Sequence, residues 1–169
     1  MTVCIAYTTK DECWMASDSA TSDGSSFAET ITPKMIKHAG GGLIGSAGSW
    51  HVINLLSPLQ KKDVEVQDVV DLIRSIKEGP HSEELEGVSV IMAWPGRPLT
   101  VVYWGGFYFE LKSPFAAIGS GEDYALGFLE GAKDEIDGAV LKKAVAAAAK
   151  YSKSVGLPAK LLHVRKGSE

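Results

Sequence analysis

The sequence TVCIAYTTKDECWMAS, residues 2–17, decides the expected fold. Residues 2–7 alternate in character and are rich in β-forming side chains. After the turn-like residues 8–11, residues 13–17 continue the same pattern. Two such runs joined by a short polar turn are typical of a β-hairpin. The chain is therefore expected to begin with a pair of adjacent strands.

The rest of the chain divides into groups of strands and groups of helices. Further strands are predicted at residues 30–38, 43–48, 88–94, 99–104, 107–111, 115–118 and 160–165. Apolar residues at helical spacing predict two helices between residues 49 and 79 and two more between 121 and 156. Pro33 favours an edge or a bulge for its strand, and Pro58 is expected to kink or end its helix. The composition of residues 22–26 indicates a loop.

This order of elements narrows the fold class. Helices follow strands in groups and do not alternate with them, which argues against a doubly wound parallel sheet. A four-layer αββα sandwich, in which two antiparallel sheets are flanked by helix pairs, fits the grouping. Composition alone does not choose this α+β arrangement over another α+β fold.

Length, charge and cysteine content restrict the class of protein. A chain of 169 residues with 45% hydrophobic residues fits one domain, residues 1–169. A net charge of −4 gives no electrostatic reason to expect nucleic acid or an anionic membrane as partner. Cys4 and Cys13 do not make a disulfide framework, and no secretory or membrane-spanning pattern is found. We expect a soluble cytoplasmic protein with a genuine N-terminus. Because the histidines lack metal-ligand spacing, no metal or cofactor is expected.

Three polar residues suggest a catalytic centre. Thr2, Asp18 and Lys34 follow one another at intervals of sixteen residues on three successive strand-like segments. If Met1 is removed, Thr2 carries its own base, a free amine with an ordinary pKa of about 7.7–8.0. Lys34 would disfavour a second positive charge on that amine, and Asp18 would hold Lys34 in place. The alternative is that all three are ordinary strand and turn residues.

Two glycine-bearing segments add to this pattern. Acyl transfer needs donors aimed at a developing oxyanion, and Gly45, expected in a strand-to-helix turn, offers a backbone N–H. Ser120 lies between Gly119 and Gly121 ahead of a predicted helix, where its hydroxyl could assist the amine of Thr2. Taken alone, each segment is more often a structural turn than part of a catalytic site.

Taken in order, these segments resemble a known family. The matching residues are Thr2 behind a single Met, residues 16–21 (ASDSAT), Pro33-Lys34, residues 44–48 (IGSAG), and residues 117–121 (AIGSG) followed by Tyr124-Ala125. The sequence resembles proteasome β-subunits, and most closely the HslV-type peptidases, among the N-terminal-nucleophile hydrolases.

The resemblance implies an αββα sandwich and a threonine peptidase that works through an acyl-enzyme on Thr2. It implies that Lys34 tunes the amine and that Asp18 orients Lys34. It also implies that Gly45 forms the oxyanion hole and that Ser120 assists the amine. Thr21 and Ala47 are implied substrate-binding residues that align an extended peptide. The implied partners are further copies of the chain in rings, peptide or unfolded-protein substrates, and an ATP-driven unfoldase.

One departure from the family leaves alternatives open. Many proteasome subunits have an Asp-x-x-Ser-Gly pattern near the end of the last long helix, whereas this chain reads Ser152-Lys153-Ser154-Val155-Gly156. The acid is missing, and Ser152 or Ser154 could partly substitute for it. A non-catalytic assembly or binding subunit, and an amidase for small amides, therefore remain alternatives to a peptidase. The chemistry also depends on removal of Met1.

Overall fold

A computed structural model of the chain describes residues 2–22, 27–29, 34–48, 54, 56–61, 63–78 and 87–167. It contains two main antiparallel sheets. The first has four strands in the order β10 (Phe115–Ile118), β1 (Cys4–Thr8), β2 (Glu12–Ser17) and β11 (Lys160–Arg165). The second has five strands in the order β5 (Met35–His38), β6 (Gly42–Ala47), β7 (Ser89–Ala93), β8 (Leu99–Tyr103) and β9 (Phe107–Leu111).

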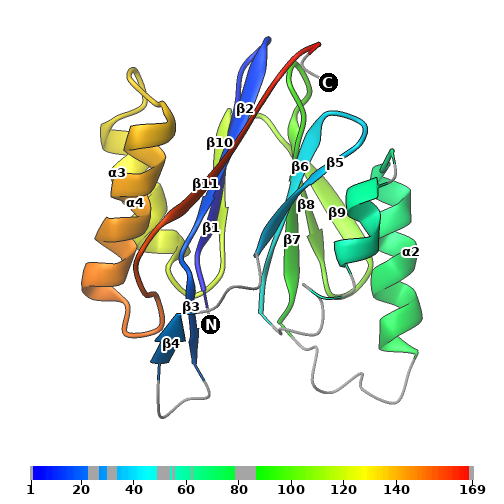
Figure 1. Cartoon of the computed structure of the whole chain (residues 1–169), viewed down its shortest axis with the longest axis horizontal. Helices are drawn as coiled ribbons and strands as arrows, with labels where there is room; N and C mark the ends of the chain where they lie inside the picture. The colour runs from blue at the N-terminus through cyan, green and yellow to red at the C-terminus, as the bar shows by residue number, and fades with distance from the viewer. Residues whose placement is uncertain are drawn as a thin grey trace.

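Helices cover the outer face of each sheet. α3 (Glu122–Gly131) and α4 (Gly138–Tyr151) pack on the four-stranded sheet, and α2 (Val66–Lys77) packs on the five-stranded sheet beside the short 3-10 helix η1 (Ser57–Lys61). Figure 1 shows the resulting layers, with the two sheets face to face between the helices. The predicted αββα architecture is confirmed.

Side-chain alternation along the first hairpin explains the layers. Cys4 and Met15 point into the apolar core between the two sheets. Val3 and Ile5, on the other face of the same sheet, join the core beneath α3 and α4. Because successive strand residues face opposite sides, a strand that is apolar at both parities can be buried on both faces. Residues 2–17 therefore lie between two cores, one shared by the two sheets and one beneath α3 and α4.

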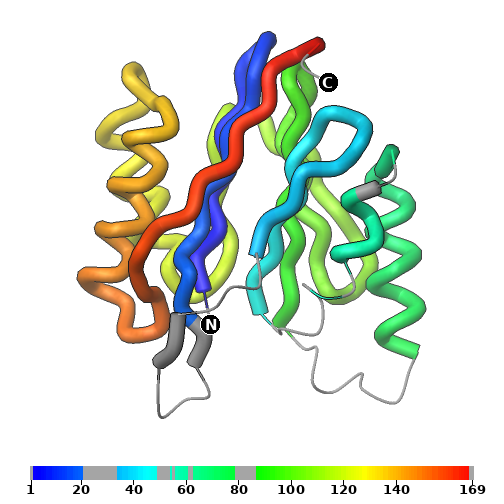
Figure 2. Tube along the Cα trace, viewed as in Figure 1, coloured from blue at the N-terminus to red at the C-terminus, as the bar shows by residue number. Residues whose placement is uncertain are grey.

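The two ends of the described chain meet in one sheet. β11 pairs with β2 along its whole length, from Lys160 opposite Ser17 to Arg165 opposite Glu12. Figure 2 shows this last strand, in red, running beside the blue N-terminal hairpin. The segment between α4 and β11 consequently lies close to the end of β2.

Some details differ from the prediction. Residues 20–22 and 27–29 form a small ribbon that was not predicted, β3 (Ala20–Ser22) with β4 (Phe27–Glu29). Of the loop predicted at residues 22–26, Ser22 ends β3 and residues 23–26 lie outside the described part. Residues 30–33 lie outside the described part, and β5 is an edge strand, as Pro33 suggested. Most of the predicted helix ahead of Pro58 also lies outside the described residues, and Pro58 itself lies in η1. Within the described residues, none of the helices combines the length and apolar character needed to cross a membrane.

Candidate active site

The predicted polar triplet meets at one end of the sandwich. Thr2 lies just ahead of β1, Asp18 directly follows β2, and Lys34 directly precedes β5. Thr2 and Asp18 are neighbours because Cys4 pairs with Ser17, so the start of β1 faces the end of β2. Lys34 arrives from the other sheet. Thr2, Asp18 and Lys34 are only 3%, 0% and 5% exposed.

Hydrogen bonds join the three side chains. Lys34 Nζ lies 2.5 Å from Thr2 Oγ1 and 2.8 Å from Asp18 Oδ1. The Thr2 hydroxyl donates to Asp18 Oδ1. The hydroxyl is thus held between a cationic donor and an anionic acceptor, an arrangement that favours loss of its proton.

The donors of Lys34 are directed at buried acceptors. Its Nζ also donates to the Ala20 carbonyl at 2.6 Å, so three acceptors face the three N–H groups of an ammonium. Burial lowers the pKa of Lys34 below its ordinary value, and the charge of Asp18 opposes this shift. The charged Lys34 ammonium, whose burial Asp18 offsets only in part, disfavours a further positive charge nearby.

Asp18 is buried but well supplied with donors. Its Oδ1 accepts the Val3 N–H at 3.1 Å, and its Oδ2 accepts the Gly156 N–H at 3.3 Å. Together with Thr2 and Lys34, these donors compensate a carboxylate that has lost its water. The Asp18 carboxylate therefore binds the main chain at Val3 on one side of the site and at Gly156 on the other.

Ser120 reaches the same place from the turn between β10 and α3. Its hydroxyl donates to the Thr2 carbonyl at 3.3 Å, and the Gly121 N–H approaches the same oxygen at 3.4 Å. Gly119 has φ 99°, and a Cβ there would collide with the Thr2 carbonyl oxygen and approach Ala47 Cβ to 3.0 Å. Glycine is needed here for both reasons. The structure thus brings Ser120 and Ala47 to Thr2.

Gly45 does not lie in an exposed turn, and that prediction is wrong. It sits in the middle of β6, between Met35 of β5 and Ile91 of β7. Its Cα faces the other sheet, where an added Cβ would collide with Cys4 Sγ and lie 2.6 Å from Met15 Sδ. Because Gly45 has no side chain, Cys4 and Met15 of the other sheet can pack directly against its backbone.

The turn lies three residues later, at Gly48. This exposed residue follows β6 and has φ 111°. The Ser46 N–H donates to the Lys34 carbonyl at 3.0 Å. Gly48 therefore stands just beyond the end of β6 that lies beside Lys34. The sequence did not separate the strand from the turn because Gly45 and Gly48 stand in one run of small residues.

Two further predicted positions are only partly described. Thr21 lies in β3 opposite Ala28, but its side chain is outside the described part. Met1 lies outside it altogether.

Among the described residues, no group of three His, Cys, Asp or Glu side chains could hold a metal ion. Burial raises the pKa of the Cys4 thiol strongly and that of Cys13 to about 12, so neither is a thiolate nucleophile.

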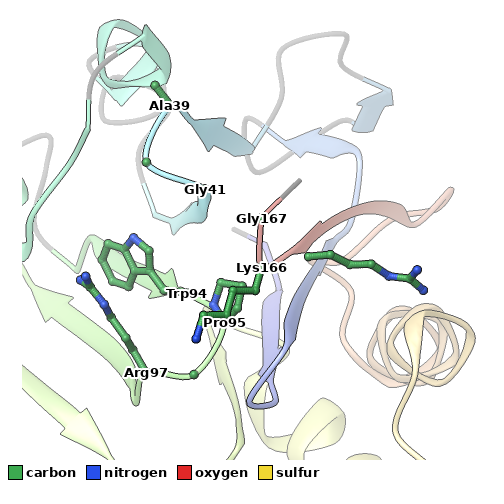
Figure 3. A pocket seen from close by; sticks show the side chains of 10 residues that line it. Ala39, Gly41, Trp94, Pro95, Arg97, Lys166 and Gly167 are labelled. Carbon is green, nitrogen blue, oxygen red and sulfur yellow. The ribbon is translucent and has the colours of Figure 1, made fainter. Parts of the chain in front are cut away.

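A separate cavity of about 600 Å³ lies at the opposite end of the sandwich. Its lining includes Trp94, Gly96, Arg97 and Lys166 (Figure 3). The Gly96 N–H donates to the carbonyl of Thr9, in the turn of the first hairpin, whereas Thr2 precedes the other end of β1. Arg97 lies over the Trp94 ring, 5.6 Å from its centroid. Thr2, Asp18, Lys34 and Ser120 are not among the residues that line this cavity.

Comparison with solved structures finds this fold in proteasome-related proteins. The structure of Thiobacillus denitrificans BPH in complex with epoxomicin aligns with a TM-score of 0.77 and 24% identity over 98% of both chains. HslV from Trypanosoma brucei aligns with a TM-score of 0.74 and 19% identity, over 98% of this chain and all of the other. Anbu, an ancestral beta-subunit from Yersinia bercovieri, aligns with a TM-score of 0.75 and 17% identity, over 97% of this chain and 82% of the other. No family model and no curated protein matches the sequence. The likeness is one of fold.

Proposed function

We propose that this chain is a threonine-type peptidase in which Thr2, exposed by removal of Met1, is the nucleophile. The observation that carries the proposal is the Thr2 hydroxyl held between Lys34 Nζ, at 2.5 Å, and the Asp18 carboxylate. The fold shared with BPH, HslV and Anbu supports it. So does the placement of Ser120 beside the Thr2 main chain.

The proposed reaction has two acyl-transfer steps. The free amine of Thr2 takes the hydroxyl proton, directly or through a water, while Oγ1 attacks the peptide carbonyl carbon. The C–N bond breaks, the leaving amine receives that proton, and an ester on Thr2 remains. A water then adds to the ester, Oγ1 leaves, and the hydroxyl regains its proton. Lys34 keeps the amine neutral between steps, and Asp18 keeps Lys34 in place.

The oxyanion of each step needs a donor at the rim of the site. We assign this role to the Gly48 N–H and not to Gly45, whose backbone is occupied between β5 and β7. Ala47, whose Cβ lies beside Gly119, and Thr21 of β3 would border an extended substrate. Pairing through the main chain would make binding tolerant of substrate sequence.

We also propose that the chain associates with further copies of itself. The four-stranded sheet covers Leu99 and Val101 of β8, but it leaves Tyr103, Phe107 and Phe109 on the same face 38%, 53% and 56% exposed. The three rings contact one another with centroids 5.5–6.1 Å apart. An aromatic patch that continues a buried face is typical of an interface. A second copy is the occupant we favour, since the Anbu neighbour is described as a subunit.

Epoxomicin provides the direct test of the nucleophile. It is an epoxyketone that needs both a hydroxyl and a free amine, so intact mass should show one adduct on protein that has lost Met1. Thr2→Ala should abolish the adduct and the hydrolysis of fluorogenic peptides, while Thr2→Ser retains part of both. Peptide hydrolysis that persists in Thr2→Ala would overturn the mechanism. Cleavage of small amides alone would identify an amidase instead.

A further inference from the structure

The cavity at the end of the sandwich opposite Thr2 has a basic lining. Arg97, Arg165 and Lys166 line it, and no acidic side chain is found among its described lining residues (Figure 3). The whole chain has a net charge of −4, so composition does not explain this concentration of cations. With a volume of about 600 Å³, the cavity has the size of a small-molecule site. It is therefore suited by charge and size to a small anion.

The first hairpin holds two walls of this cavity in place. Thr8 Oγ1, at the end of β1, donates to the Trp94 carbonyl at 2.8 Å. In the turn that follows, the Asp11 carbonyl accepts the Lys166 N–H, also at 2.8 Å. Trp94 belongs to the segment between β7 and β8, whereas Lys166 follows β11 of the other sheet. Because both segments are fixed to one hairpin, the cavity is formed before any ligand enters it.

Two ring nitrogens lie close together beside this cavity. Trp94 lines it, and the buried ring of His38 packs edge-on against Trp94, with the ring centroids 5.6 Å apart. A Cβ on Gly42 would collide with His38 Nε2 and lie 2.6 Å from Trp94 Nε1. Since glycine has no side chain, both nitrogens can approach the same point of the main chain.

The N–H group of His38 lacks an acceptor. His38 Nδ1 accepts the Gly40 N–H at 3.1 Å, so the proton of the neutral ring is on Nε2. Within the described part of the chain, Nε2 has no hydrogen-bond partner, although His38 is only 4% exposed. Buried donors nearly always have a partner. An oxygen atom of a ligand seated beside Trp94 would supply the missing acceptor.

Acidic residues near the cavity restrict the kind of anion. Arg97 Nη1 lies 3.8 Å from Glu65, and Arg165 Nε lies 3.1 Å from Glu12. Asp63 approaches the cavity at the turn between β5 and β6. A ligand must compete with these carboxylates for the arginines. A phosphate group, with a charge of about −1.5 to −2, competes better than a carboxylate, which carries a single charge.

We propose that this cavity is a binding site for the phosphate group of a small molecule. Arg97 and Lys166 would balance its charge, and the N–H groups of the Trp94 and His38 rings would donate to its oxygens. These donors come from three separate segments of the chain, which suits a tetrahedral group with three acceptor oxygens. The site is separate from Thr2 and does not depend on the proposed peptidase function.

Binding is tested by isothermal titration calorimetry of the full chain with inorganic phosphate, pyrophosphate and acetate at one ionic strength. Phosphate and pyrophosphate should each bind saturably at one site per chain, and acetate should bind at least about tenfold more weakly than phosphate. Saturable binding of neither phosphate compound would overturn the proposal. Acetate that binds as tightly as phosphate would overturn the assignment to phosphate.

The cations are tested by Arg97→Gln combined with Lys166→Gln, which should weaken pyrophosphate binding by about tenfold or more. Both side chains are exposed, so the fold should tolerate the changes. The matched control is Lys142→Gln combined with Lys143→Gln on the exposed side of α4, which alters the net charge equally and should leave binding unchanged. An equal loss in the two double variants would mean that overall charge attracts the anion, and the site would be refuted.

The ring donors are tested by Trp94→Phe, which keeps an aromatic ring but removes its N–H. We expect pyrophosphate to bind this variant about tenfold more weakly, because a hydrogen bond to a charged group is lost. Trp104→Phe is the control, since Trp104 packs in the core beneath α2 and does not line the cavity. Wild-type affinity in folded Trp94→Phe would exclude the indole from the site. The result for Arg97 and Lys166 stands even if Trp94→Phe does not fold.

Discussion

Lys34 Nζ lies 2.8 Å from Asp18 Oδ1, and the two side chains, only 3% and 0% exposed, come from different sheets. Asp18 follows β2 of the four-stranded sheet, and Lys34 precedes β5 of the five-stranded sheet. Their ion pair joins the sheets at the end of the sandwich where Thr2 lies. Removing one partner of a buried pair leaves the other charge uncompensated, which usually costs more than the pair itself contributes.

Asp18→Asn and Lys34→Met should therefore each lower the free energy of unfolding by about 3–5 kcal/mol, as measured by urea unfolding. The double variant should recover part of this loss, because neither charge is then left alone. The control is Glu130→Gln, which breaks an exposed pair with Lys133 and should change stability by less than about 1 kcal/mol. Additive losses in the double variant would show that the two residues are not coupled.

Gly119→Ala should impair the site through the main chain of Thr2. The residue has φ 99°, and the new Cβ would press on the Thr2 carbonyl oxygen, so we expect a stability loss of about 1–3 kcal/mol. Activity per folded molecule should fall at least about tenfold. Gly127→Ala in α3 is the matched control, since open space surrounds a Cβ there. That change should be neutral or stabilising by up to about 1 kcal/mol.

Gly45→Ala tests the contact between the sheets. Its Cβ would meet Cys4 Sγ and Met15 Sδ in a close-packed core, so urea unfolding should show a loss of about 1–3 kcal/mol. Cys4→Ala in the same chain should relieve part of that loss by removing one of the two sulfurs. A loss that is strictly additive in the double variant would mean that the collision with Cys4 does not set the cost.

Acid should destabilise the protein through His38. Burial lowers the pKa of this histidine, while Asp63 and Glu65 raise it in part and Arg97 lowers it further. Its ring packs against Trp94, and its Nδ1 accepts the Gly40 N–H. In the unfolded chain a histidine takes up a proton near pH 6.5, before the folded one does, so stability falls as the pH drops through that value.

Replacing His38 with Phe should make this acid-dependent loss smaller, as measured by urea unfolding at pH 7.5 and pH 5.5. His163→Gln, at the edge strand β11, leaves His38 in place and should keep the loss. Equal acid sensitivity in wild type and His38→Phe would exclude this histidine as the cause.

Self-association should depend on the aromatic patch of β8 and β9. Phe107→Ser combined with Phe109→Ser should yield smaller species in sedimentation velocity, because the patch loses most of its apolar surface. Tyr108→Ser is the matched control, since Tyr108 lies on the other face of the same strand and is similarly exposed, at 48%. A wild-type protein that sediments as a monomer would contradict the assembly proposal.

The sequence was most informative where local pattern and long-range pairing agree. The pattern of residues 2–17 predicts a β-hairpin, and the structure contains that hairpin, buried on both faces. The same hairpin brings Thr2 beside Asp18, because the register that pairs Cys4 with Ser17 makes the two flanking residues neighbours. The meeting of these residues could be predicted without knowing the second sheet.

Features that depend on contacts between distant segments could not be predicted in this way. Gly45 is small because Cys4 and Met15 come to it from the other sheet, and nothing local distinguishes that glycine from Gly48. The β3–β4 ribbon has three residues in each strand, too few for a period to show. Ser152 and Ser154 are recognised as partners of Ser120 only when the end of α4 is seen beside the turn after β10.

The pairing of β11 with β2 has a consequence for the timing of biosynthesis. Gly156, which donates to Asp18, and Ser154, which bonds to Ser120, belong to the segment that leads into β11. A nascent chain that has exposed only its first hairpin holds Thr2 and Asp18 but not these partners. The centre is therefore completed only when the last strand has left the ribosome and docked. Under the proposed function, the nascent chain would thus remain inert toward peptide bonds until its last strand has docked.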